Sequence, residues 1–313
     1  MSLPTFLKLV EIQTKLASLF PFIVGLLFVI YRFDAFDPVN TIIFFSGMLI
    51  FDLTTTAINN YMDYKKATSE IYKKESNIIG QKEIPEWLVV TTILTMLSIA
   101  TTLGIWLVFR TDLFVLFIGM VCFGIGIFYT FGPIPLSRMP LGEVFSGVTM
   151  GFGITFLIIY VNAFDQGIAN LLLTGRTLSF EMDILLMLEI FWISLPCIFT
   201  IANIMLANNI CDLEDDIKNK RFTLPYYIGR KNAVRLFDAL YIFSFLAILS
   251  AVSFNVLPLV MLLVLIVGVP VFQHVHKFNQ KQSKAETFSV SLKNMVLVNG
   301  SMVAALIIAI IVL

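Results

Sequence analysis

Three oxygen-bearing side chains stand at helical spacing in the second half of the chain. Asn208, Asp212 and Asp216 occupy positions i, i+4 and i+8, which lie along one face of a helix. Such a stripe is unfavourable unless a positive charge lies among the oxygens. Mg²⁺ takes oxygen ligands and is commonly shared between one or two carboxylates and the phosphates of a substrate. A solvated acidic helix end would explain the polarity but not the spacing, so the pattern favours a magnesium site.

A similar pair occurs in the first half of the chain. Asn59 and Asp63 stand at i and i+4, about 6 Å apart along a helix axis. Taken alone, this pair is best interpreted as polar residues that cap a helix where it leaves the lipid. The occurrence of the same Asn and Asp pattern at a second helix end favours a ligand that both stretches bind. Basic residues follow both stretches: Lys65, Lys66, Lys73, Lys74, Lys218, Lys220 and Arg221. Membrane topology alone places cations there, and a subset is suited to binding a diphosphate.

The composition indicates that these polar stretches lie at the ends of membrane-spanning helices. Hydrophobic residues make up 58% of the 313 residues and charged residues 13%, against roughly 25% charged in a soluble domain. Crossing the hydrocarbon layer takes about 20 mainly apolar residues. The stretches predicted to cross it are Leu16–Tyr31, Thr41–Ile58, Trp87–Phe109, Leu113–Phe131, Val144–Phe164, Ile184–Asn208, Ala233–Phe254, Val256–Phe272 and Asn294–Leu313.

Positive charge is unequally divided between the two sides that these helices define. Arg32, Arg110 and Arg176 lie on one side, and the other eighteen of the 21 Lys and Arg residues lie on the side of the N-terminus. Because cytoplasmic loops carry the excess of Lys and Arg, we predict a multi-pass protein of the cell membrane with a cytoplasmic N-terminus and Leu313 outside. The long charged loops are cytoplasmic, so function is expected there. The outer connections are short apart from residues 165–183.

The cysteines and the N-terminal segment argue against a zinc protein, a disulfide-rich protein and a cleaved signal peptide. Cys122, Cys197 and Cys211 form no CxxC pair, so neither a zinc site nor a disulfide framework is indicated. No small-residue cleavage signature follows the first apolar run, which is therefore predicted to be a retained helix and not a signal peptide. The recurring Asn and Asp stretches predict a single transmembrane domain over residues 1–313, with two related halves at about 1–140 and 141–313.

The stretch from Asn208 to Asp216, followed by Arg221–Leu224, resembles the second signature of the UbiA prenyltransferase superfamily. Its paired asparagines and Thr-Leu spacing are most like the menaquinone branch, the 1,4-dihydroxy-2-naphthoate polyprenyltransferases. Tyr129–Pro135 and Leu141–Glu143 are similar to the segment that joins the fourth and fifth helices in that branch. The resemblance extends over nearly the whole chain.

This resemblance implies an all-α bundle of about nine transmembrane helices around a central cavity that opens to the cytoplasmic side and laterally to lipid. It also implies a polyprenyl diphosphate substrate, an aromatic acceptor resembling dihydroxynaphthoate, a Mg²⁺ cofactor, a demethylmenaquinone product and no nucleic-acid partner. Carried over position by position, the metal residues are Asn59, Asp63, Asn208, Asp212 and Asp216, of which Asp63, Asp212 and Asp216 are catalytic. The residues implied for the phosphates are Lys66, Arg138 and Arg221.

The sequence departs from the family pattern at the first signature. That signature usually reads Asn-Asp with a further Asp downstream, whereas this chain has Asn60 and, at the later position, Ser69 beside Glu70. Glu70 is the candidate substitute acid. A basic residue that the family often has early in the first helix is replaced near Glu11.

Further side chains are candidates for the lining of the cavity. Asp52 lies inside a predicted membrane helix, and an intramembrane acid marks a functional site by default. A hydrogen bond to Thr56 is the alternative for Asp52. Tyr61 and Tyr129 are candidate aromatic faces near the prenyl carbon at which charge develops, and Glu143 is a further cavity candidate.

Other functions compete with prenyl transfer. A secondary transporter suits the helix count and paired halves, but it predicts charge and broken helices near the midplane, whereas the acids here concentrate at helix ends. Phosphotransfer to a lipid alcohol is disfavoured because the sequence has no tight Asp-x-x-Asp-Gly pattern. Two alternatives stay open: a prenyltransferase for another aromatic acceptor, and a non-catalytic paralogue that binds or transports a quinone or its precursor.

Overall fold

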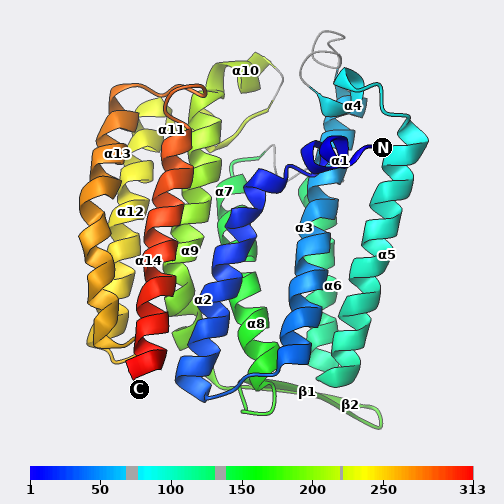
Figure 1. Ribbon diagram of the computed structural model, residues 1–313, viewed down its shortest axis with the longest axis vertical. Coiled ribbons are helices and arrows are strands. Elements are labelled where there is room, and N and C mark those ends of the chain that lie inside the picture. The colour runs from blue at the N-terminus through cyan, green and yellow to red at the C-terminus, as the bar shows by residue number, and fades with distance from the viewer. Residues whose placement is uncertain (68–76, 131–138, 219–220, 313) are drawn as a thin grey trace. The chain divides into compact units, whose positions relative to one another are not determined.

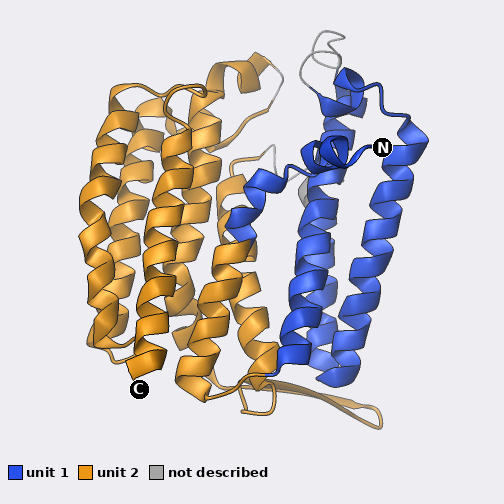
Figure 2. Cartoon of the chain, viewed as in Figure 1, with its two compact units in different colours: residues 1–18, 37–135 blue, residues 19–36, 136–313 orange. Residues whose placement is uncertain are grey.

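A computed structural model of the chain describes residues 1–67, 77–130, 139–218 and 221–312, and for residues 128–130 only the backbone. The described residues form helices joined by loops, with one two-stranded hairpin (Figure 1). The predicted all-α class is confirmed. The chain divides into two compact units: unit 1 comprises residues 1–18 and 37–135, and unit 2 comprises residues 19–36 and 136–313 (Figure 2).

Unit 1 is built from long helices and a folded N-terminal segment. Its described elements are α1 (Leu3–Leu9), the 3₁₀ helix η1 (Ile12–Lys15), α3 (Pro38–Lys66), α4 (Ile78–Gln81), α5 (Glu86–Arg110) and α6 (Leu113–Thr130). Asp37 starts α3 by accepting hydrogen bonds from the backbone N–H groups of Val39 and Asn40. Arg110 at the end of α5 donates to Asp37 and Asn40 at 3.0 and 2.6 Å, so it joins these ends of α3 and α5.

The core of unit 1 places the N-terminal segment against α3 and α5. Its buried members are Leu9, Val10, Ala57, Ile79, Ile84, Val89, Ile93 and Met96. Where these side chains do not face lipid, their burial makes the main favourable contribution to the free energy of packing the segments together. Residues 2–18 are therefore an integral part of unit 1.

Unit 2 holds the remaining elements. They are α2 (Leu16–Phe33), α7 (Gly142–Ser146), the π-helical η4 (Gly147–Gly153), α8 (Ile154–Ala163), β1 (Ala169–Thr174), β2 (Thr177–Met182), α9 (Ile184–Cys211), α10 (Leu213–Lys218), α11 (Leu224–Ile228), α12 (Arg230–Ser253), the 3₁₀ helix η5 (Leu259–Val267), α13 (Gly268–Gln280) and α14 (Ser289–Val312). Glycine lets η4 approach α9 closely, because a Cβ added to Gly151 would lie 2.6 Å from the backbone nitrogen of Ile198.

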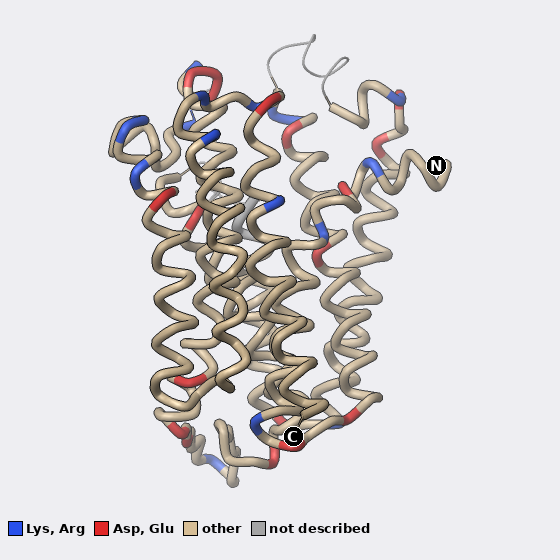
Figure 3. Tube along the Cα trace, turned by 60° about the vertical axis from the view of Figure 1, so that its left-hand side comes forward, with Lys and Arg blue, Asp and Glu red and all other residues tan. Residues whose placement is uncertain are grey.

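Eight segments of the described chain are long and apolar enough to cross a membrane. They are Ile12–Phe33, Pro38–Lys66, Glu86–Arg110, Gly142–Ala163, Ile184–Cys211, Arg230–Ser253, Leu259–Gln280 and Ser289–Val312. Each overlaps one predicted span, and charged residues lie mostly near the helix ends (Figure 3). The predicted span Leu113–Phe131 coincides with α6, in which residues 113–127 form a shorter apolar helix. The count of nine spans and the central cavity stay predictions.

The division into units differs from the predicted halves in one element. Residues 19–36, which include most of α2, group with unit 2, although they lie within the predicted first half of the sequence. Whether the halves are related by descent stays a prediction.

A β-hairpin occupies the long connection at residues 165–183, where the sequence was read only as a loop. β1 and β2 pair antiparallel, with Leu173 opposite Leu178, and a two-residue turn joins them. Gly175 in that turn has φ +64°, a conformation that glycine adopts without strain. The Tyr160 hydroxyl of α8 donates to the carbonyl of Ala169 at 3.0 Å and so attaches the hairpin to the helix before it.

Candidate functional site

The later acidic stretch lies at the junction of α9 and α10 in unit 2. α9 ends at Cys211, and Asp212 is its C-cap residue, so the helix is interrupted within the stripe. Backbone hydrogen bonds nevertheless continue across the interruption: the N–H of Asp212 donates to the carbonyl of Asn208 at 3.0 Å, and the N–H of Asp216 donates to that of Asp212 at 2.8 Å. The three side chains therefore keep helical spacing.

Lys284 brings a positive charge to this stripe. It belongs to the loop between α13 and α14, and its Nζ donates to Oδ1 of Asn208 and, at 2.6 Å, to Oδ2 of Asp212. The same ammonium lies 4.9 Å from the centroid of the Phe288 ring. Sequence reasoning missed this role because Lys284 is 72 residues from Asp212 and was indistinguishable from the other lysines on the same side of the predicted spans.

Asp216 lies beside Arg221 at the buried end of the stripe. Asp216 is 6% exposed, and its Oδ1 lies 3.5 Å from Nε of Arg221, whose backbone N–H donates to the Asp216 carbonyl. Burial raises the pKa of Asp216, and the charge of Asp212 acts in the same direction, while Arg221 opposes the shift. Among the described residues, no donor reaches Oδ2 of Asp216. This buried oxygen is therefore suited to a cation.

Glu143 is held by the residue next to the stripe. Asn209 of α9 donates from Nδ2 to Oε1 of Glu143 at 2.8 Å, and the two residues are 1% and 4% exposed. Oε2 of Glu143 and Oδ1 of Asn209 have no hydrogen-bond partner within the described chain. The contact joins the start of α7 to α9, immediately beside Asn208.

The earlier stretch lies within α3 in unit 1. The predicted span ended at Ile58, but α3 continues to Lys66, so Asn59 and Asp63 lie in its last two turns. Both residues are half-buried, and Lys66 is exposed. The predicted i, i+4 placement of Asn59 and Asp63 on one helix is therefore confirmed, although the apolar stretch that predicted the span ends at Ile58.

Asn60 takes part in a structural network. Its Nδ2 donates to the carbonyl of Leu9 at 2.9 Å and to Oε1 of Glu11 at 3.2 Å, while its own carbonyl accepts from Nδ2 of Asn77 at 2.9 Å. Glu11 has the left-handed backbone value φ 47° and ends the turn between α1 and η1. Asn60 and Glu11, two of the positions at which the sequence is expected to depart from the family pattern, are thus in contact.

Tyr61 and Lys65 both reach Glu86 at the start of α5. Nζ of Lys65 lies 2.6 Å from Oε2 of Glu86, and the Tyr61 hydroxyl is 3.5 Å from the same oxygen. These contacts lie within unit 1 and tie the end of α3 to α5.

Asp52 belongs to a buried ion pair. Lys15 donates to Oδ1 of Asp52 at 2.8 Å, and the Ser18 hydroxyl donates to Oδ2 at 2.7 Å. Lys15 also donates to Oγ1 of Thr56 at 2.6 Å. The alternative expected for Asp52 was wrong in its partner, because the Thr56 hydroxyl donates to the backbone carbonyl of Asp52 and not to its carboxylate.

Several candidates fall outside the described part of the chain. They are Arg138, Ser69, Glu70 and the side chain of Tyr129. Their proposed roles rest on the sequence alone.

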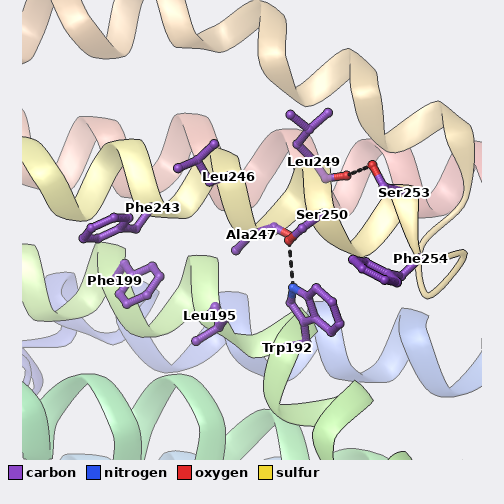
Figure 4. Close-up of a pocket in the computed structure, with 10 residues that line it drawn as sticks. All are labelled: Trp192, Leu195, Phe199, Phe243, Leu246, Ala247, Leu249, Ser250, Ser253 and Phe254. Atoms are coloured by element: carbon purple, nitrogen blue, oxygen red, sulfur yellow. Dashed lines mark hydrogen bonds between the residues drawn. The ribbon is translucent and has the colours of Figure 1, made fainter.

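An apolar groove of about 530 Å³ lies on α9 and α12, away from the acidic stripe (Figure 4). No charged side chain lines it, and Nε1 of Trp192 donates to the Ser250 hydroxyl across it at 3.0 Å. Because it lacks polar groups that converge on one point, the groove is not a candidate for the diphosphate.

Comparison with known proteins identifies the family. Residues 18–299 match the profile of the UbiA prenyltransferase family. The 1,4-dihydroxy-2-naphthoate octaprenyltransferase of Bacillus subtilis (strain 168) is 27% identical over 252 residues, which are 78% of this chain and 72% of that protein.

Solved structures share the fold. A UbiA homologue from Archaeoglobus fulgidus bound to DMAPP and Mg²⁺ gives a TM-score of 0.64 at 14% identity, with 99% of this chain and 100% of that one covered. The apo structure of a UbiA homologue from Aeropyrum pernix K1 gives 0.70 at 14% identity, covering 93% and 98% of the two chains. Since the family profile matches most of its length, the chain belongs to the UbiA prenyltransferase family.

Proposed function

We propose that this protein transfers a polyprenyl group from polyprenyl diphosphate to 1,4-dihydroxy-2-naphthoate, with loss of carbon dioxide, and so forms demethylmenaquinol, the reduced form of demethylmenaquinone. The family and the name of the Bacillus subtilis relative support this reaction. The observation that carries the proposal is the arrangement of Asn208 and Asp212 around Lys284, with Asp216 beside Arg221. Carboxylates interleaved with cations suit a diphosphate held through a metal.

Asp212 and Asp216 are the proposed ligands of Mg²⁺, with the side-chain oxygen of Asn208. No group of three or more His, Cys, Asp or Glu in the described part of the chain forms a complete metal site. Two carboxylates are nevertheless enough for Mg²⁺, because this ion usually completes its shell with waters and substrate phosphates. The buried Oδ2 of Asp216 fits such a cation. When bound, Mg²⁺ supplies the charge that stabilises the leaving diphosphate.

Lys284 and Arg221 are the proposed phosphate donors of this half of the site. Without substrate, Lys284 holds the side chains of Asn208 and Asp212 together. When the substrate binds, the Lys284 ammonium donates its hydrogen bonds to a phosphate oxygen in their place. Arg221 stays beside Asp216 and offers its guanidinium to the same diphosphate. Neutralising the leaving group from the protein side lowers the barrier to breaking the bond between prenyl carbon and oxygen.

Asn59 and Asp63 are the proposed metal ligands of the earlier motif, and Lys66 and Arg138 are further proposed phosphate donors. Asn60 stands where the family pattern has an Asp. Its amide donates to Leu9 and Glu11, so we do not propose it as a metal ligand.

The proposed chemistry is substitution at an allylic carbon. The bond between that carbon and the diphosphate oxygen breaks, the ring carbon that carries the carboxylate forms the new carbon–carbon bond, and the carboxylate leaves as carbon dioxide. Water must be excluded while the cation exists. Tyr61 and Tyr129 remain proposed aromatic neighbours, whereas Asp52 and Glu143 hold helices through buried partners.

The proposed orientation has the N-terminus in the cytoplasm of a cell whose plasma membrane contains the protein. The charge asymmetry supports it, because only three of the 21 Lys and Arg residues fall on the other side of the predicted spans. Both acidic motifs then face the cytoplasm, from which a charged naphthoate and a diphosphate headgroup would come.

The experiment is transfer of a labelled polyprenyl group to dihydroxynaphthoate by purified protein in lipid nanodiscs, with Mg²⁺ or with EDTA. Product is expected only with Mg²⁺, and Asp212→Ala is expected to abolish it. Asp215→Ala is the matched control, since Asp215 is exposed and pairs with Lys218 off the stripe. Product in EDTA, or full activity of Asp212→Ala, would refute the site.

The acceptor is tested in parallel with a hydroxybenzoate. Product from this ring alone would replace the proposed acceptor but keep the prenyltransferase. Absence of product from either acceptor, together with saturable binding of a menaquinone precursor, would favour the non-catalytic alternative.

A further inference from the structure

The hairpin of β1 and β2 has one apolar and one largely polar face. Residues directly opposite each other in an antiparallel pair point to the same side of the ribbon. The pairs Ala169–Met182, Leu171–Phe180 and Leu173–Leu178 therefore share a face that is wholly apolar. The alternate pairs are Asn170–Glu181, Leu172–Ser179 and Thr174–Thr177, and five of these six residues are polar or charged.

The apolar face is uncovered toward the tip of the hairpin. Leu173 is 61% exposed, Leu178 64% and Phe180 52%. The base is fixed: Ala169 is buried, and the N–H of Asp183 donates to the carbonyl of Ile168 at 3.0 Å. An isolated two-stranded hairpin is at best marginally stable in water, so an exposed apolar ribbon of this kind needs a surface to rest on.

The position of the hairpin in the chain identifies that surface. It connects α8, which ends at Ala163, directly to α9, which begins at Ile184, and both belong to membrane-spanning segments. The ribbon runs across the direction of these helices at the end of unit 2 opposite α10 (Figure 1). A ribbon so placed lies along the plane in which the bilayer meets water.

We propose that the apolar face of this hairpin lies on the lipid surface, at the boundary between headgroups and acyl chains, with the opposite face in water. Deeper insertion is excluded because the outer edges of a two-stranded sheet carry backbone groups that hydrocarbon cannot satisfy. Arg176 stands in the turn and is exposed, within reach of phosphate headgroups. The hairpin is thus an interfacial anchor, the β counterpart of an amphipathic surface helix.

The test compares two neighbouring positions on opposite faces. Single cysteines replace Leu178 and Thr177 in the full chain after Cys122, Cys197 and Cys211 have been changed to alanine. Each is labelled with an environment-sensitive fluorophore in nanodiscs that hold one copy of the protein. The Leu178 label is expected to emit at shorter wavelength and to be quenched several-fold more by brominated lipid than the Thr177 label.

Controls separate the alternatives. A label at Leu246, half exposed on α12, reports the response of a lipid-facing site, and thermal unfolding of each labelled protein verifies that it is folded. Equal, water-like emission from both hairpin labels would overturn the proposal, as would equal quenching of both. Protection of the Leu178 label only in discs that hold two copies would show that a second chain, and not lipid, covers the face.

Discussion

Nδ2 of Asn60 donates to Oε1 of Glu11 at 3.2 Å, so the amide in α3 holds the turn that precedes η1. The same amide donates to the carbonyl of Leu9. A carboxylate at position 60 would lose both donated hydrogen bonds and would face the carboxylate of Glu11. The amide of Asn60 and the carboxylate of Glu11 are therefore energetically coupled, because each supplies the hydrogen-bond partner of the other.

Exchange of this amide for an acid is expected to destabilise unit 1. Asn60→Asp leaves buried acceptors without donors, which costs about 1–3 kcal/mol, and adds repulsion with Glu11. Thermal unfolding in detergent measures the loss. Glu11→Gln alone is expected to be mild, because the amide oxygen still accepts from Asn60, and Glu11→Gln in the Asn60→Asp background is expected to recover part of the stability. Additive effects in the double variant would contradict the coupling.

Replacement of Lys284 is expected to weaken use of the diphosphate. Lys284→Met removes a charge-assisted hydrogen bond worth about 1.5–3 kcal/mol, which corresponds to a loss of roughly 10- to 100-fold in kcat/KM. Lys281→Met is the matched control, since Lys281 lies in the same loop but pairs with Glu286. Equal losses in both variants would indicate a general effect on the loop and would count against a specific role for Lys284.

Removal of Lys15 is expected to leave a buried carboxylate without its cation. Lys15→Met breaks a pair whose side chains are 8% and 16% exposed, and loss of one partner of a buried pair costs about 3–5 kcal/mol. The double variant Lys15→Met with Asp52→Leu is expected to regain most of this stability, because neither charge remains. Thermal unfolding of the single and double variants is the measurement. A single variant as stable as the parent would show that the pair contributes nothing.

The stability of the metal-free protein is expected to depend on the charge of Asp216. Burial raises the pKa of this carboxyl above its ordinary value of 3.8, so the folded state favours the protonated form. The contribution of this carboxyl to the free energy of unfolding is therefore fully present below pH 3.8. It is lost as the pH rises through the raised pKa of the folded state. Asp216→Asn is expected to stabilise the protein in EDTA at neutral pH and to lose this advantage as pH falls. A difference that does not vary with pH would contradict the raised pKa.

The sequence was sufficient to locate most helices because membrane spans are encoded locally. α5, for example, runs from Glu86 to Arg110 against a predicted Trp87–Phe109. The apolar stretch ends at Ile58, whereas the backbone of α3 stays helical to Lys66, so hydropathy alone marks the lipid-crossing part of a helix and not its end.

Partners that come from distant segments could not be predicted in this way. Lys15 and Asp52 are 37 residues apart, and Glu11 and Asn60 are 49 apart. No periodicity links such positions, since each pairing depends on how the N-terminal segment folds back on α3. The acidic stripe was recognisable because its members stand four residues apart in the sequence, whereas the cation between Asn208 and Asp212 comes from the loop after α13.

The length of α9 links the two ends of unit 2. Its 28 residues rise roughly 42 Å, well beyond the about 30 Å of the hydrocarbon layer. One end begins at the hairpin and the other ends at the acidic stripe. A ribbon that rests on one leaflet would therefore fix how far Asp212 lies beyond the surface of the opposite leaflet. The thickness of the bilayer would then set the depth of the reaction site.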